Sequence, residues 1–249
     1  MTKRYALRDD QWQQIKDLLP GRASIVGVTA KDNRLFVEAV LYRYRSGIPW
    51  RDLPERFGDF RVVHTRFSRW AKASIWQKVF EVLAKNSDNE YAMLDSTIVR
   101  AHQHSAGKKK EQAIGRSKGG LSTKIHARTD ALGNPTGFYL TAGQAHDLNG
   151  ADMLLDLSLS QTWLMDKAYN SKDRVIDPIH EIKGQIVMPS KSNAIDQRDY
   201  DPHLYKARHL IENFFAKLKQ YRGIATRYDK LAQNFLSAIY LASIMIWLN

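Results

Sequence analysis

The 249-residue sequence predicts an α/β protein, in which an all-α domain over residues 1–86 precedes a mixed-sheet domain over residues 87–249. Three observations lead to this fold class. Apolar residues recur at helical spacing through the first third of the chain. A polar stretch, KNSDNE at 85–90, then marks a boundary. Beyond it, short apolar runs alternate with helical patterns, which is typical of a sheet flanked by helices, parallel on one side and antiparallel at a hairpin edge.

The first domain is expected to be helical throughout. Segments 7–20 and 32–47 have the apolar spacing of helices, and a proline and a glycine end them. A short helix around 52–57, a glycine-containing turn and a longer helix from Phe60 predict a helix-turn-helix, whose second helix enters the DNA major groove. A basic amphipathic hairpin is the alternative. The side chains expected to face phosphates or base edges are Arg61, His64, Arg66 and Arg69.

The second domain begins with an apolar segment at 91–99, expected to be a strand that ends near Asp95. Segments 122–130 and 136–143 flank a Gly-Asn-Pro turn and predict a hairpin. The elements expected after it are helix 152–159, strand 162–169, helix 171–182, strand 184–190, helix 205–221 and a buried terminal helix 235–248.

The amino-acid composition limits the classes of function that the protein can have. The net charge is +12, and residues 1–80 hold 16 Lys and Arg against 8 Asp and Glu. Such a basic front end predicts a polyanionic partner, nucleic acid above all. The basic residues are interleaved with aromatic residues inside expected helices, which disfavours an anionic membrane. The sequence has no cysteine, so disulfides, cysteine-ligated zinc and thiol catalysis are excluded. The apolar run 235–248 is shorter than the about 20 residues of a membrane span.

Three carboxylates occupy positions that the expected secondary structure does not explain by itself. Asp95 and Asp166 each follow an apolar strand, where an unpaired carboxylate is costly. Glu212 lies on helix 205–221, within roughly 60° of Tyr205, Arg208 and Lys219 and opposite an apolar stripe. Taken singly, each Asp could cap a neighbouring helix, and Arg208 with Glu212 could be an ordinary surface ion pair.

Together the three carboxylates would suit Mg²⁺ or Mn²⁺, the cations that prefer oxygen ligands and bind substrate phosphates. Two such ions can stabilise both oxygens of a phosphoryl displacement. His102 and His104 could bind zinc, but with no cysteine or fitting third histidine, a loop or DNA contact is preferred. His146 and Asp147 could line the site or hold structure by hydrogen bonds.

The chain resembles bacterial insertion-sequence transposases of the insertion sequence 5 family, of the DDE class. Their carboxy-terminal signature is Tyr, two residues, Arg, three residues, Glu, six residues and Lys, and it is met by Tyr205, Arg208, Glu212 and Lys219. The blocks LDSTIVRAHQHSAG, GRSKGGLSTKIHA, DKAYNS and PSKSN also resemble that family in order, as does the amino-terminal GIPWRDLPERFG.

The resemblance implies an RNase H-like catalytic domain in which Asp95, Asp166 and Glu212 hold two Mg²⁺ ions, with Mn²⁺ as a substitute. It implies cleavage of double-stranded DNA at inverted terminal repeats, then transfer of the 3′-hydroxyl to target DNA. Tyr205 is expected to order the DNA or its helix. A homodimer or higher oligomer on DNA is expected, in the bacterial cytoplasm with the nucleoid. Further expected DNA contacts are Lys108, Lys109, Lys110, Lys124, Lys191, Arg208 and Lys219.

Two alternatives share the DNA partner. A regulator derived from a transposase would bind DNA without cutting it. A metal-dependent nuclease would cut DNA without joining strands.

Overall fold

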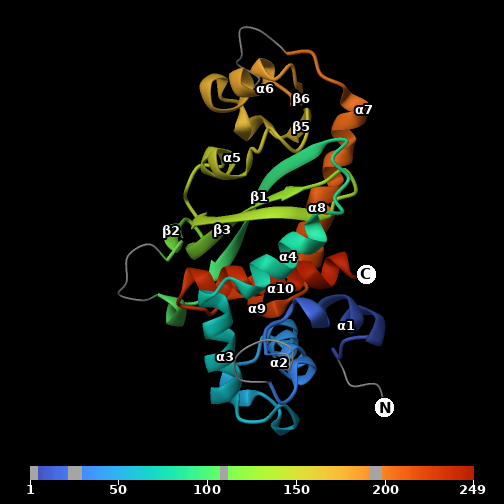
Figure 1. Ribbon diagram of the computed structural model, residues 1–249. Coiled ribbons are helices and arrows are strands. Elements are labelled where there is room, and N and C mark those ends of the chain that lie inside the picture. The colour runs from blue at the N-terminus through green and yellow to red at the C-terminus, as the bar shows by residue number, and fades with distance from the viewer. Residues whose placement is uncertain (1–4, 22–29, 107–111, 191–197) are drawn as a thin grey trace. The chain divides into compact units, whose positions relative to one another are not determined.

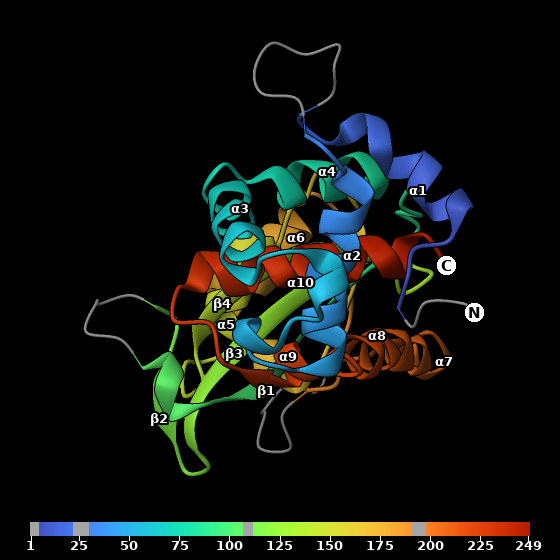
Figure 2. The same cartoon turned by 90° about the horizontal axis from the view of Figure 1, so that it is seen from below.

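The structure is a computed structural model that describes residues 5–21, 30–106, 112–190 and 198–249. Figure 1 labels its elements, and Figure 2 gives the view from below. The chain divides into two compact units: a helical unit, Met1–Leu83 with Leu218–Asn249, and a sheet unit, Ala84–Lys217. The predicted boundary after residue 86 lies close to this division, whereas the segment after Lys217 clusters with the helices. As functional domains, the predicted boundaries stay a prediction.

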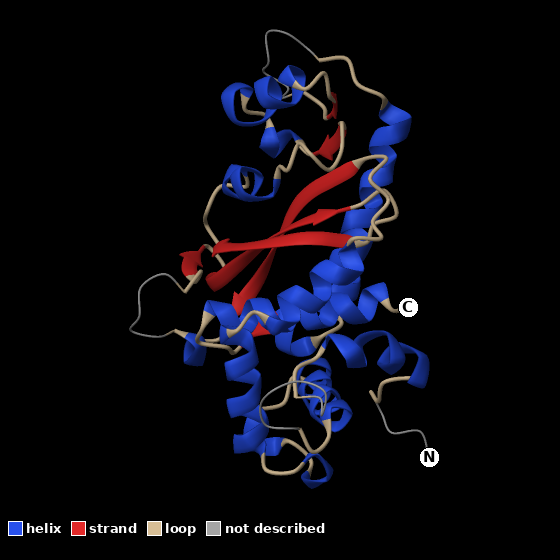
Figure 3. Ribbon diagram, viewed as in Figure 1, coloured by secondary structure: helices blue, strands red, loops and turns tan. Residues whose placement is uncertain are grey.

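The sheet unit is built around its first strand, as the red arrows of Figure 3 show. Strand β1 pairs antiparallel with β3 on one side and parallel with β5 on the other. β3 also pairs with β2 and with its hairpin partner β4, and β5 pairs in parallel with β6. The predicted mixed sheet is therefore confirmed. The bounds of these strands are β1 Ala92–Ala101, β2 Gly115–Ser117, β3 Gly120–Thr129, β4 Pro135–Ala142, β5 Thr162–Met165 and β6 Gln185–Val187.

Strand β1 continues well past the point where the sequence predicted its end. Asp95 lies inside the ladder opposite Ala127, and pairing continues to Arg100 opposite Ser122. The ladder uses backbone groups, so it does not stop where the side chains become polar. The polar residues that follow Asp95 are accommodated because they are only partly buried, and Ile98 is exposed.

The helices of the sheet unit are α5 (Leu148–Leu154), α6 (Asp177–Glu181), α7 (Pro202–Tyr205) and α8 (His209–Lys219). The single helix predicted over 205–221 is thus two helices joined by the 3₁₀ turn Lys206–Arg208, and they follow each other along one line in Figure 2. Pro202 opens α7, and Asp201 caps it by accepting backbone N–H bonds from His203 and Leu204. α5 lies earlier than predicted, and α6 is preceded by a π turn.

Alternation along β1 divides the residues of the sheet between two faces. Leu94 belongs to a core with Trp163 and Met165, which also contains Tyr169 of the turn after β5. Asp95 lies on the opposite face, where its ladder neighbours Ala127 and Phe138 are found.

Helix α8 covers the face of the sheet that carries Asp95. The Phe214 ring packs 5.8 Å, centroid to centroid, from Phe138. Gly133, in the turn between β3 and β4, has φ +81°, and a Cβ there would lie 2.9 Å from Leu210 Cβ. The helix therefore rests directly on the hairpin turn.

The helical unit departs from the prediction around the expected helix-turn-helix. The short helix predicted at 52–57 is two 3₁₀ turns, Trp50–Asp52 and Glu55–Phe57. A proline precedes each of them, and proline offers no backbone N–H and a fixed φ. Helix α3 then begins after Asp59, which accepts the Arg61 backbone N–H at 2.8 Å. The predicted long helix is broken at Ser74, where φ is 54°.

The helices of this unit pack around α10. The predicted buried terminal helix is confirmed, because α10 carries a run of buried residues on all sides. In the part of the chain that the structure describes, no helix is long and apolar enough to cross a membrane. The bounds are α1 Asp9–Ile15, α2 Asn33–Ser46, α3 Phe60–Lys72, α4 Ile75–Ala84, α9 Arg222–Ala225 and α10 Ala232–Trp247.

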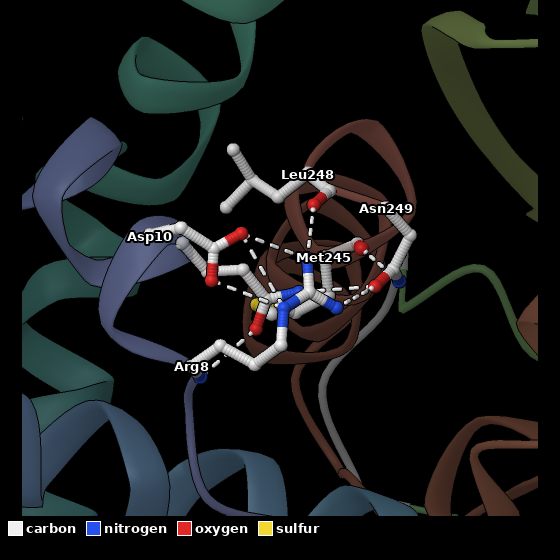
Figure 4. A network of polar contacts seen from close by, with 6 residues as sticks. Arg8, Asp10, Met245, Leu248 and Asn249 are labelled. Atoms are coloured by element: carbon white, nitrogen blue, oxygen red, sulfur yellow. Dashed lines mark hydrogen bonds and ion pairs between the residues drawn. The ribbon is translucent and has the colours of Figure 1, made fainter.

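A polar network joins α1 to the end of α10 (Figure 4). The Arg8 guanidinium donates to Leu248 O at 3.2 Å and to Asn249 Oδ1 at 3.0 Å. Asp10 binds the same guanidinium at 3.0 Å, and Asn249 donates to Met245 O at 2.7 Å. Arg8 and the Asn249 side chain thereby each satisfy one carbonyl group, those of Leu248 and Met245, that a helix carboxy terminus leaves free.

Candidate active site

Two of the predicted carboxylates stand at neighbouring positions of the sheet. Leu94 of β1 pairs with Met165 of β5, so Asp95 and Asp166 are the next residues of two parallel strands. Side-chain alternation places both on the face opposite the Leu94 core. Asp166 also accepts the Ala168 backbone N–H at 2.5 Å, so it caps the turn after β5. The capping role is therefore realised, and the place of Asp166 in a catalytic site stays a prediction.

The third carboxylate reaches the site through an arginine. Arg208 Nη2 lies 2.7 Å from Asp95 Oδ2 and 3.5 Å from Glu212 Oε1. The same guanidinium donates through Nη1 to the Tyr205 hydroxyl at 3.3 Å. The side chains of Asp95 and Arg208 are 18% and 14% exposed, whereas that of Glu212 is 60% exposed. The arginine of the signature therefore bridges a buried and an exposed carboxylate.

The electrostatics reflect this burial. Burial raises the pKa of Asp95, against the opposing effect of Arg208 and the Ser96 backbone N–H. Burial alone would lower the pKa of Arg208, but the Asp95 carboxylate and the Tyr205 hydroxyl outweigh it and raise that pKa. The pKa of Tyr169 is raised by burial and then by the negative charges of Asp95, Asp147 and Asp166. Negative charge thus converges on this end of the sheet.

The donor set fits a hard divalent cation, since it consists of carboxylate oxygens on one sheet face and on the helix above it. Within the described ranges, no three His, Cys, Asp or Glu side chains lie close enough together to hold a metal ion. In this structure the Arg208 Nη2 atom contacts both Asp95 and Glu212.

The four residues predicted on α3 to face DNA differ in their surroundings. Arg61, His64 and Arg69 are exposed. Arg66 instead lies over the Phe36 ring at 4.2 Å and donates to Asn33, so it packs against its own unit. The His64 ring lies 5.2 Å from the Trp50 ring, and burial lowers its pKa.

The other predicted DNA contacts are also divided. Lys219 is exposed at the end of α8. Lys124 is buried, and its ammonium donates to Ala145 O at 2.6 Å and to Asp147 Oδ1 at 2.9 Å. The Lys124 ammonium is thus engaged by two acceptors of the sheet unit. Lys108, Lys109, Lys110 and Lys191 lie outside the described residues.

Two smaller sequence expectations can be placed. His102 Nδ1 accepts the backbone N–H of His104 at 3.3 Å, which is a loop role. Asp147, for which the sequence left a structural and a site role open, binds Ser96 of β1 as well as Lys124. The sequence analysis did not single out Ser96, and only its position after Asp95 could have drawn attention to it.

Comparisons with known proteins show the family of the chain. A family described as "Transposase DDE domain" matches residues 87–248, and one described as "Putative transposase of IS4/5 family" matches residues 7–80. A putative transposase for insertion sequence element IS6501 from Brucella ovis is 35% identical over 130 residues, which are 52% of this chain and 100% of the relative.

Two further relatives have no function in their names. An uncharacterized protein y4sN from Sinorhizobium fredii is 47% identical over 114 residues, 46% of this chain and 86% of the relative. An uncharacterized 16.2 kDa protein of insertion element IS402 from Burkholderia cepacia is 31% identical over 105 residues, 37% of this chain and 71% of the relative. No solved structure matches the chain.

A match over more than half of the chain shows the class: this is a nucleotidyl-transfer enzyme with a transposase DDE domain. With the amino-terminal match, the chain belongs to the insertion-sequence transposases of the DDE class, as the sequence predicted. The predicted fold class is confirmed as well. Transposase membership implies a DNA partner, and DDE domains use divalent metal ions.

Proposed function

We propose that this transposase binds the terminal inverted repeats of its element, cleaves the DNA there and joins the freed 3′-hydroxyl to target DNA. One observation carries the proposal: Asp95 and Asp166 are adjacent on one sheet face, and Arg208 links Glu212 to Asp95. Bringing two element ends together calls for at least a dimer on DNA.

Asp95, Asp166 and Glu212 are the residues that would hold the cations, two Mg²⁺ or Mn²⁺ ions. When bound, such ions supply activation of water and neutralisation of charge on the reacting phosphodiester. The burial of Asp95 strengthens its electrostatic interactions, because water screens them less there.

Arg208 would exchange partners during this process. Its Nη2 atom contacts both Asp95 and Glu212, so if these carboxylates held a cation together, Arg208 would give up at least one of the two contacts. A guanidinium released in this way can bind phosphate oxygens, for which its planar geometry is suited. The Tyr205 hydroxyl accepts a hydrogen bond from Nη1 and would keep the guanidinium at the amino-terminal end of α8.

Cleavage of labelled terminal-repeat DNA in Mg²⁺ tests this assignment. Asp95→Ala, Asp166→Ala and Glu212→Gln are each expected to reduce cleavage by roughly 10³-fold, about the loss when an electrostatic stabiliser is removed. Asp173→Asn removes an exposed carboxylate of the same unit and is the matched control. Full activity in any of the three variants contradicts the triad. Binding without cleavage by the parent protein points to a regulator, and cut ends that are never joined point to a nuclease.

Helix α3 is the proposed DNA reader of the helical unit. At about 100° per residue, one stripe of exposed side chains holds Arg61, Val62, Thr65, Arg69 and Lys72, and the exposed His64 lies at its edge. The stripe is cationic at its ends. Val62 is 64% exposed and apolar, and with Thr65 it offers methyl groups for contact with thymine methyls. Arg61, Arg69 and Lys72 would bind phosphates.

Binding assays at several salt concentrations separate these roles. Arg69→Ala is expected to weaken binding to every sequence and to reduce the salt dependence by about one phosphate contact. Thr65→Ala should instead change the preference among terminal-repeat variants and leave the salt dependence unchanged. Arg66→Ala is the informative comparison, because its loss should lower stability through Phe36 more than it lowers the salt dependence. Equal salt slopes for the parent and Arg69→Ala would contradict the assignment of α3.

A further inference from the structure

The residue that follows Asp95 is held from the other face of the sheet. Ser96 pairs with His126 in the ladder, and its side chain alternates to the face opposite Asp95. There the Ser96 hydroxyl donates to Asp147 Oδ1 at 2.5 Å. Asp147 immediately precedes α5.

Asp147 is in turn fixed by a buried cation. Lys124 Nζ of β3 donates to the same Oδ1 atom at 2.9 Å and to Ala145 O at 2.6 Å. The side chains of Lys124 and Asp147 are 10% and 26% exposed. Burial by itself would raise the pKa of Asp147, but the hydrogen bonds from Ser96 and Lys124 lower it, so the carboxylate is held ionised. One oxygen atom thus joins β1, β3 and the start of α5.

The start of α5 cannot shift easily on this face. A Cβ on Gly150 would lie 2.3 Å from His126 Nδ1, so the helix backbone approaches the β3 side chains closely. Arg128 of β3 donates to Leu154 O at 3.0 Å at the other end of the helix. Asp147 is therefore anchored to a segment of fixed position.

We infer that Asp147 is a positioning residue of the proposed catalytic site, because it fixes β1 at Ser96 and so fixes the neighbouring Asp95 carboxylate beside Asp166. This inference rests on the proposed function. Asp147 contacts neither DNA nor cation in this role; it acts through the strand.

Cation affinity measures this positioning directly. Asp147→Asn keeps the shape of the side chain and removes its charge, and it should weaken Mn²⁺ binding at least about tenfold, the lower end for groups that orient metal ligands. Mn²⁺ binding is followed by the loss of the free-ion electron paramagnetic resonance signal. The half-saturating Mg²⁺ concentration for cleavage should rise by a similar factor, with the rate recovering at high Mg²⁺.

Ser96 provides a milder test that leaves the buried ion pair intact. Ser96→Ala removes the hydroxyl that Asp147 binds and should weaken Mn²⁺ binding in the same direction by a smaller factor, whereas Ser96→Thr keeps a hydroxyl and should restore it. Asp152→Asn is the matched control, because Asp152 lies on the same helix in an exposed pair with Arg174. That control should bind Mn²⁺ like the parent.

The outcomes are distinguishable from those of the proposed function. A parent protein that neither binds Mn²⁺ nor cleaves DNA overturns the proposed function and the role of Asp147 with it. A parent that does both, with Asp147→Asn and Ser96→Ala within twofold of its Mn²⁺ affinity, overturns the role of Asp147 alone. If Asp147→Asn fails to fold, the Mn²⁺ affinities of Ser96→Ala and Ser96→Thr test the role of Asp147 instead.

Discussion

Each unit of the protein buries an arginine–aspartate pair, and the two pairs differ in what surrounds them. In the helical unit, Arg43 Nη1 lies 3.5 Å from Asp229 Oδ2, and their side chains are 4% and 6% exposed. The Tyr44 hydroxyl completes this pair by donating to Asp229 at 3.0 Å. In the sheet unit, the pair of Arg208 and Asp95 opens onto an exposed glutamate.

The difference shows how the same two side chains serve stability in one place and chemistry in another. The enclosed pair of Arg43 and Asp229 cannot exchange partners, so its interaction serves only to stabilise the fold. An open pair has a second carboxylate available, so Arg208 can leave Asp95 without losing every partner. Surroundings, and not the pair itself, therefore distinguish a structural arginine from a candidate functional one.

The largest expected effect that tests this comparison is on stability. Asp229→Asn leaves the Arg43 charge buried without compensation, and it should lower the free energy of unfolding by about 3–5 kcal/mol. Asp95→Asn should leave that free energy unchanged or raise it. Its folded pKa is raised, so ionised Asp95 destabilises the fold as pH rises through the ordinary pKa of a carboxyl group. Urea unfolding at pH 7 gives both values. Similar losses in the two variants would break the comparison.

A smaller effect on stability is expected from His126, a buried side chain of the sheet unit that stays uncharged. Burial lowers the pKa of His126 to about 4, with Asp147 opposing and Lys124 assisting. A depressed histidine pKa means that the unfolded chain binds the proton first. Stability contributed by neutral His126 is therefore complete above pH 6.5 and is lost as pH falls toward 4. The loss should be on the order of 2 kcal/mol.

Urea unfolding between pH 7 and pH 4 measures the contribution of His126. It gives the slope of the free energy of unfolding against pH, which is compared between the parent and a His126 variant. His126→Gln keeps a hydrogen-bonding side chain opposite Thr141, whose hydroxyl lies 2.8 Å from His126 Nε2. The variant should show a shallower fall in stability than the parent over that range. Parallel curves would mean that His126 is not held neutral by its surroundings.

Local patterns predicted much of the fold and the candidates for the site. The apolar stripe opposite Glu212 is real, since Ile211, Phe214 and Phe215 are buried. Asp166 does follow its strand directly. These features can be predicted from the sequence because helical periodicity and strand ends depend on residues that are neighbours in the chain.

The structure differs from the sequence expectations where distant parts of the chain decide a residue's surroundings. The end of β1 depends on its pairing with β3, and no pattern within 91–99 records that pairing. Lys124 looked like a phosphate contact because its partner Asp147 comes 23 residues later. Arg66 looked the same, because its cation–π contact with Phe36 is invisible in helical spacing.

Gly133, which contacts α8, offers a way to change the position of that helix from outside the candidate site. Gly133 combines a left-handed backbone with contact against Leu210, so any side chain there must push the helix outward. Arg208 immediately precedes that helix, and Glu212 lies on it. We therefore expect side chains of increasing size at position 133 to shift Glu212 away from Asp95 and Asp166 by increasing amounts, while all three acidic residues are retained.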